Sequence, residues 1–108
     1  MGRVDGVEFT QDADDRTHAF YLYTLHLRKN RDRILKALND AGVGAAVYFK
    51  TPVHRTPLYA RLGYGRKVLK KTEVAAGHVI SLPVHPALSA EDLQTVAEQF
   101  LAAARANL

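Results

Sequence analysis

The most regular hydrophobic pattern in the chain runs from residue 89 to its C-terminal end. Ser89 and Asp92 have the spacing of a helix capping box, and the preceding Leu88 can pack on the first turn. Apolar side chains then recur every three to four residues, the period of one helical face: Leu93, Val96, Ala97, Phe100, Leu101 and Ala104. The pattern predicts a terminal helix that buries one full face, so the rest of the chain must provide a surface for it to cover.

A small β-sheet is the predicted partner of that helix. Residues 20–28 alternate between two faces and are rich in aromatic side chains, which is typical of a strand, and residues 43–49 and 78–82 predict two more. Helical patterns follow at three places: residues 31–41, 57–62 and the later part of 66–76. The predicted fold class is therefore α+β, a small, largely antiparallel sheet with helices packed on one face.

Local signals define the ends of the first helix and the extent of the domain. Asn30 is expected to cap the helix, Gly42 to end it, and Asp32 to pair with Lys36 one turn later. Residues 1–17 are polar, acidic and without a clear period, so we expect an acidic linker or tail there. A single domain is expected over residues 18–108.

Charge is distributed unevenly along the chain. Residues 28–71 carry twelve basic and two acidic side chains, a net charge of +10, whereas residues 1–27 and 72–108 each have a net charge of −3. A basic middle indicates an anionic partner, which can be a nucleic acid, a phosphorylated ligand or an acidic protein surface. A simply solvated surface explains the same charge.

Several kinds of site are excluded by residue types and spacing. The chain has no cysteine, so it forms no disulfide and uses no thiol nucleophile. Its five histidines show no metal-ligand spacing, and neither a nucleophile elbow nor a phosphate-binding glycine loop is present. No apolar run is long enough to span a bilayer and the first residues have no signal-peptide core, so we expect a cytoplasmic protein.

His54 is the most informative single residue, because it lies between Pro52 and Pro57 with Lys50 and Arg55 beside it. A rigid loop with these donors can present them to a phosphate or a sugar. Aromatic and basic residues interleave nearby, as they do in proteins that bind single-stranded nucleic acid. Tyr59 and Leu62, however, share a helical face and are more simply explained as core, so a nucleic-acid partner is the less favoured alternative.

Five stretches in the same order resemble the C-terminal small domain of the DegT/StrS-type sugar aminotransferases, which use pyridoxal phosphate in the type I fold. They are residues 18–23 (HAFYLY), 30–32 (NRD), 42–49 (GVGAAVYF), 52–64 (PVHRTPLYARLGY) and 81–89 (SLPVHPALS). The resemblance implies a domain that closes over the active site and helps to form a nucleotide-sugar pocket. It also implies that Tyr48, Lys50, His54 and Arg55 lie nearest the substrate.

The same resemblance implies what lies outside this chain. In the family, a large N-terminal domain carries the Schiff-base lysine and holds the pyridoxal phosphate. We therefore expect no catalytic, cofactor-binding or metal-binding residue here, and no transamination by the chain alone. The expected partners are that large domain, a nucleotide sugar in the intact enzyme, and further copies in a homo-oligomer. A stand-alone binding module of the same fold is the alternative.

Overall fold

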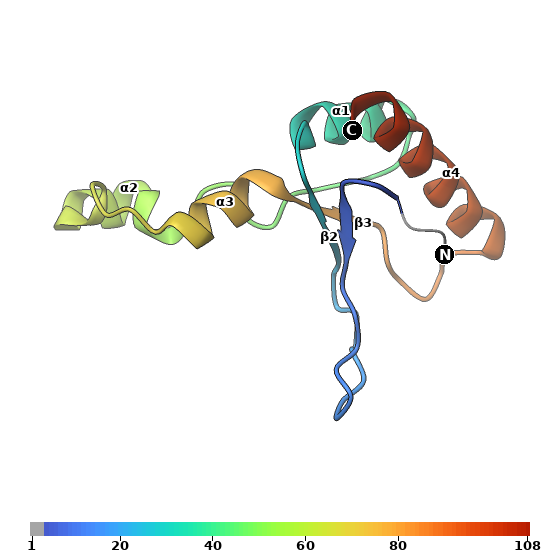
Figure 1. The fold of residues 1–108 in the computed structure, drawn as a ribbon, viewed down its shortest axis with the longest axis horizontal. Helices are drawn as coiled ribbons and strands as arrows, with labels where there is room; N and C mark the ends of the chain where they lie inside the picture. Colours follow the sequence, from blue (N-terminus) through green and yellow to red (C-terminus); the bar gives the residue numbers. More distant parts are fainter. Residues whose placement is uncertain (1–3) are drawn as a thin grey trace.

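A computed structural model describes residues 4–108 as a three-stranded antiparallel sheet with two helices on one face (Figure 1). The strands are β1 (Val7–Phe9), β2 (Tyr23–Leu27) and β3 (Val79–Leu82), in that spatial order. The covering helices are α1 (Arg31–Asp40) and α4 (Ala90–Asn107). The expected α+β class, with an antiparallel sheet, is confirmed.

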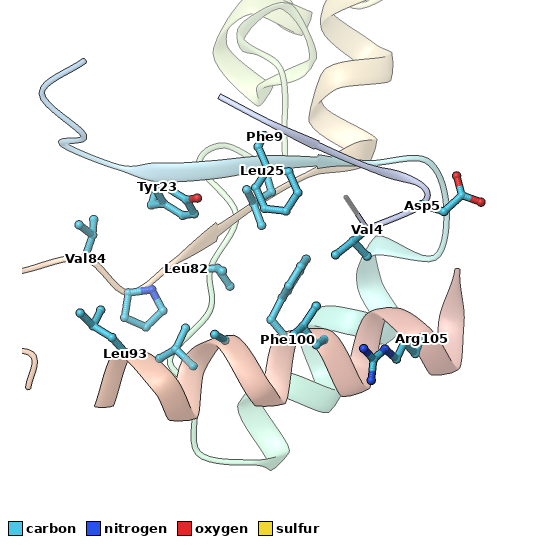
Figure 2. Close-up of a pocket in the computed structure, with 14 residues that line it drawn as sticks. Val4, Asp5, Phe9, Tyr23, Leu25, Leu82, Val84, Leu93, Phe100 and Arg105 are labelled. Carbon is cyan, nitrogen blue, oxygen red and sulfur yellow. The ribbon is translucent and has the colours of Figure 1, made fainter. Parts of the chain in front are cut away.

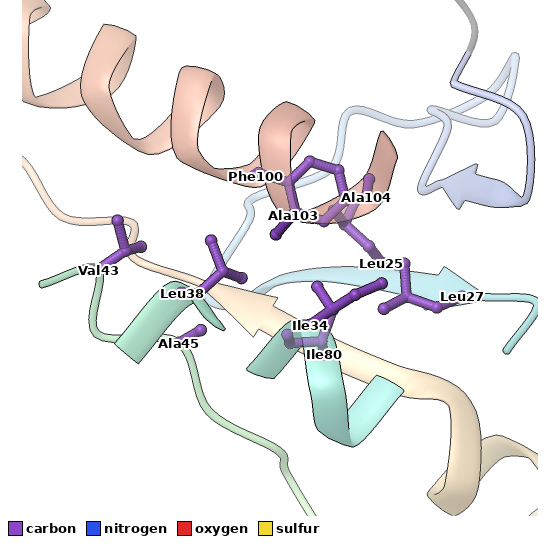
Figure 3. Packing of buried hydrophobic residues seen from close by; sticks show 10 residues of the cluster. All are labelled: Leu25, Leu27, Ile34, Leu38, Val43, Ala45, Ile80, Phe100, Ala103 and Ala104. Carbon is purple, nitrogen blue, oxygen red and sulfur yellow. The ribbon is translucent and has the colours of Figure 1, made fainter. Parts of the chain in front are cut away.

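The hydrophobic core lies between the sheet and these two helices (Figure 3). The sheet contributes Leu25, Leu27 and Ile80, all pointing to the same side because alternate residues of a strand share a face. Helix α1 supplies Ile34 and Leu38, which lie four residues apart on one face. The last turns of α4 complete the cluster with Phe100, Ala103 and Ala104.

A second group of elements projects away from the sheet and its helices (Figure 1). We call residues 48–78 the arm. It contains two short 3₁₀ or π-type turns, Val53–Arg55 and Ala60–Tyr64, and the helices α2 (Pro57–Tyr59) and α3 (Lys70–His78). None of the buried hydrophobic residues of the described chain belongs to the arm.

This projection makes the molecule larger than a compact domain. The radius of gyration is 15.7 Å, whereas a compact domain of this length has a radius of about 13 Å. The principal extents of 48 × 36 × 27 Å show the same elongation. The arm therefore extends beyond the compact part of the molecule that holds the hydrophobic core.

Two sequence expectations about the sheet are wrong. Within residues 1–17, expected to form a tail, Val7–Phe9 form β1, and Phe9 lies opposite Leu25 of β2. Residues 43–49, expected to form a strand, make only one bridge, between Ala46 and Ser81. Neither segment carries a hydrophobic pattern long enough for periodicity to decide, so pairing with the neighbouring strand determines the outcome.

The helix ends agree with the sequence more closely, with two exceptions. Ser89 and Asp92 form both hydrogen bonds of the capping box, and Gly42 has the left-handed conformation expected after α1. Asn30, expected to cap α1, makes no capping bond, because its side chain donates instead to the carbonyl of Asn107. Lys36 pairs with Asp40 rather than with Asp32, one turn towards the C-terminus instead of the N-terminus.

The apolar stripe of α4 is buried over only part of its length. Phe100 and Ala104 are enclosed, whereas Leu93 is 53% exposed. The expectation that this helix buries one full face is therefore wrong for its first turns. Tyr59 and Leu62, expected in the core, are also exposed on the arm.

Candidate functional site

The four residues singled out by the sequence all lie where the chain leaves the sheet and enters the arm. The structure brings two of them together: the side chains of His54 and Arg55 meet on Glu73 of α3. Lys50 lies apart from this cluster, and its ammonium is 3.9 Å from a carboxylate oxygen of Asp32. Tyr48 is half exposed, and its ring packs edge-on against Phe49.

His54 is the most enclosed residue of the arm, with 7% of its surface exposed. Its Nε2 is 2.9 Å from Oε1 of Glu73. The sequence expectation placed this imidazole in contact with a sugar or phosphate. The structure shows one ring nitrogen already engaged within the arm, so His54 acts first as a packing and hydrogen-bonding residue.

Arg55 ties two further parts of the arm to the same carboxylate. Its guanidinium donates to Oε1 of Glu73 at 3.0 Å and to the carbonyl of Gly65 at 2.8 Å. The backbone N–H of Leu69 donates to the same Glu73 oxygen at 3.3 Å. The Glu73 carboxylate therefore joins the outgoing segment to the start of α3, and Arg55 links both to the turn at Gly65.

These contacts strongly favour the ionised form of Glu73. The hydrogen bond from His54 is the largest cause, followed by those from Arg55 and from the Leu69 N–H, and together they lower the pKa of Glu73 from 4.5 to about 2. The carboxylate is consequently charged throughout the physiological range. Glu73 serves as a fixed anion rather than as an acid or base that exchanges protons near neutral pH.

Arg31 fastens the arm to the sheet and helices. It is the first residue of α1 and is only 5% exposed. Its Nη1 donates to the carbonyls of Ala76 and Val79 at 3.0 and 2.8 Å, and its Nε donates to Asp32 at 2.8 Å. A cation at the end of α3 also complements the negative end of the helix dipole.

Sequence reasoning identified neither Arg31 nor Glu73. Glu73 carried a usable signal, because it is the only acidic residue among seven basic ones in residues 48–78. An isolated acid in such a segment has a strong electrostatic reason to be surrounded by cations. Nothing in the sequence distinguishes Arg31 from the other charged residues near the start of its helix.

The described residues hold no group of histidines and carboxylates that fits a metal ion. Among the same residues, no helix is both long and apolar enough to cross a membrane. The arm can therefore interact with a ligand through exposed cationic and aromatic side chains. The hydrogen bonds around Glu73 hold the backbone that carries them.

Comparison with known proteins shows where similar chains occur. The model of the DegT/DnrJ/EryC1/StrS aminotransferase family matches residues 1–101. A dTDP-3-amino-3,4,6-trideoxy-alpha-D-glucose transaminase of Micromonospora megalomicea subsp. nigra is 36% identical over 90 residues, covering 82% of this chain and 24% of that protein. The "pleiotropic regulatory protein" of Geobacillus stearothermophilus is 37% identical over 95 residues, with 88% and 25% covered.

Solved structures of aminotransferases are also similar to this chain. The chain matches S. venezuelae DesV, crystallised in complex with a ketimine intermediate, with a TM-score of 0.85 at 26% identity, over 94% of this chain and 27% of that one. A sugar aminotransferase of Micromonospora echinospora matches with a TM-score of 0.78 at 30% identity, over 92% and 26%. The chain thus spans about a quarter of the length of the relatives it matches, and it belongs to the DegT/DnrJ/EryC1/StrS aminotransferase family.

Proposed function

We propose that this chain is the C-terminal domain of a pyridoxal-phosphate-dependent sugar aminotransferase, and that it closes over an active site carried by a large domain. The arm is the observation that carries this proposal. It projects from the folded part of the molecule and has no hydrophobic core, although it is internally tied by the Glu73 carboxylate. An ordered projection of this kind needs an opposing surface, and in this proposal the large domain opposes the segment from Tyr48 to Arg55.

The residues of this chain do not fit the cofactor itself. Pyridoxal phosphate is held through a lysine amine, which an enzyme activates by enclosing it or by placing charges beside it. All six lysines of the chain are exposed, and none lines the apolar cavity between α4 and the sheet. We infer that the lysine and the phosphate-binding groups belong to the large domain and that this chain does not transaminate alone.

The segment from Tyr48 to Arg55 is our proposed substrate-facing surface. Lys50 can contribute a positive charge to a nucleotide-sugar phosphate, since its side chain is 65% exposed and its ammonium lies as far as 3.9 Å from its partner Asp32. The exposed ring of Tyr48 can lie against a sugar or a base. His54 and Arg55 line the same pocket in this proposal, with their bonds to Glu73 fixing how they are presented.

A reconstituted enzyme tests the cofactor assignment. The chain is mixed with the N-terminal three quarters of a sugar aminotransferase of the family, pyridoxal phosphate is added, and borohydride fixes any imine to its lysine. Mass spectrometry is expected to find the adduct only on the large-domain fragment. An adduct on a lysine of this chain would show that our assignment of the cofactor is wrong.

A substitution tests the substrate-facing segment in the same mixture. Lys50→Ala is expected to raise the KM for the nucleotide sugar by about tenfold and to leave kcat nearly unchanged, because one charge-assisted contact is lost. Lys29→Ala, an exposed lysine outside the arm, is the matched control. Equal KM values for the two variants would remove Lys50 from the proposed pocket.

A further inference from the structure

An open apolar groove lies between α4 and the sheet (Figure 2). Its volume is about 740 Å³, which is in the range of sites that hold a ligand or several side chains. Apolar residues from both walls line it: Phe9, Tyr23, Leu82, Leu93, Val96 and Phe100. Asp5 and Arg105 lie on opposite walls at the same end, so the groove is apolar along its length and charged only at that end (Figure 2).

The arm carries exposed apolar side chains at Leu58 and Leu62, which we call the ridge. Leu58 and Leu62 lie one helical turn apart and are 55% and 62% exposed. Val53 and Val68, elsewhere on the arm, are also exposed. Large apolar side chains gathered on one projecting element are typical of a surface that another protein covers.

Charge makes the ridge and the groove complementary. Every residue that lines the groove comes from residues 4–25, which have a net charge of −4, or from residues 82–105, which have a net charge of −2. The arm has seven basic side chains and one acidic side chain, a net charge of +6. Opposite net charges on two apolar surfaces guide them towards each other and disfavour pairing of like surfaces.

We propose that the arm of one copy of this chain docks in the α4 groove of a second copy. The arm cannot reach its own groove, since the arm and α4 extend to opposite sides of the sheet (Figure 1). The contact follows the helix-in-groove mode, in which apolar side chains one turn apart enter a hydrophobic channel. Because arm and groove are different surfaces, the contact is heterologous, and a complex of two copies joined by a single contact leaves one arm and one groove free.

The heterologous contact allows a sharp test by sedimentation of the 108-residue chain over a series of concentrations. The wild-type chain is expected to associate at low salt. The arm variant Leu58→Ser/Leu62→Ser and the groove variant Leu93→Glu change only exposed residues, and each is expected to weaken association by tenfold or more, since apolar burial is lost. An equimolar mixture of the two variants should form a 1:1 complex, since one retains its groove and the other its arm.

Two comparisons separate this contact from other kinds of association. Tyr21→Ser removes an exposed aromatic residue outside both surfaces and is expected to leave association unchanged. Raising the ionic strength from about 0.1 M to about 1 M shortens the screening length from about 10 Å to about 3 Å and should weaken the complex severalfold. A wild-type chain that stays monomeric would overturn the proposal. So would a mixture of the two variants that fails to associate, or an arm variant that associates as tightly as the wild type.

Discussion

Arg31 is the residue through which the arm depends on the rest of the fold, and its truncation has a calculable effect. Arg31→Ala removes two hydrogen bonds from a buried guanidinium to the carbonyls of Ala76 and Val79. A hydrogen bond that involves a charged group contributes about 1.5–3 kcal/mol. Taking the lower figure for each, because water can enter the vacated space, we expect a loss of about 3 kcal/mol in the free energy of unfolding.

A loss of this size is readily measured. A domain of this length is stable by about 5–15 kcal/mol, so the midpoint of urea denaturation should fall clearly while the slope stays the same. Amide hydrogen exchange gives the location of the effect. Exchange in the last turn of α3, which ends at His78, should accelerate more than exchange in α1.

Arg33→Ala is the matched control, because Arg33 lies on the same helix and is exposed. Its effect should stay within about 0.5 kcal/mol. Arg31→Lys keeps the charge but not the fork of donors, so an intermediate loss is expected. If Arg31→Ala and Arg33→Ala unfold at the same urea concentration with the same exchange pattern, the proposed role of Arg31 as the anchor of the arm is refuted.

Three further predictions concern the arm, the core and a helix end. The contribution of the Glu73 carboxylate to the free energy of unfolding should be complete above pH 4.5 and lost as the pH falls towards 2, since its pKa is lowered to about 2. The NMR shifts of the His54 ring and the Leu69 amide should follow that loss. Glu73→Gln should produce the same loss of stability at neutral pH. Leu38→Ala, at a fully buried position, should cost about 2–5 kcal/mol in urea denaturation. Ser89→Ala should cost about 1 kcal/mol by the same assay, because the capping box is lost, and unchanged stability would contradict the role of that box.

The parts of the fold that the sequence predicts well are those with long periods or specific end signals. Helices α1 and α4 combine a 3.6-residue period with a glycine or a capping box at one end, and both are confirmed. The strand Val7–Phe9 is only three residues long, so its formation depends on pairing with β2 rather than on its own pattern.

The candidate site was only partly predictable for a related reason. His54 is notable in the sequence because of its basic and proline neighbours, but its partner Glu73 lies nineteen positions away and is brought to it by the return of the arm. The exposure of Leu62 and Leu93 was not predictable, since a hydrophobic period indicates which face of a helix is covered without indicating what covers it. In both cases the sequence does not reveal which distant segments come into contact in the folded structure.

Fragment complementation tests the central claim most directly. A sugar aminotransferase of the family is truncated to its N-terminal three quarters, and pyridoxal-phosphate-dependent amino transfer to its nucleotide-sugar substrate is measured with and without this chain. Our account predicts that the truncated enzyme alone and this chain alone are inactive, and that the mixture transfers the amino group. If the enzyme's own C-terminal quarter restores transfer under these conditions and this folded chain does not, the proposed function is contradicted.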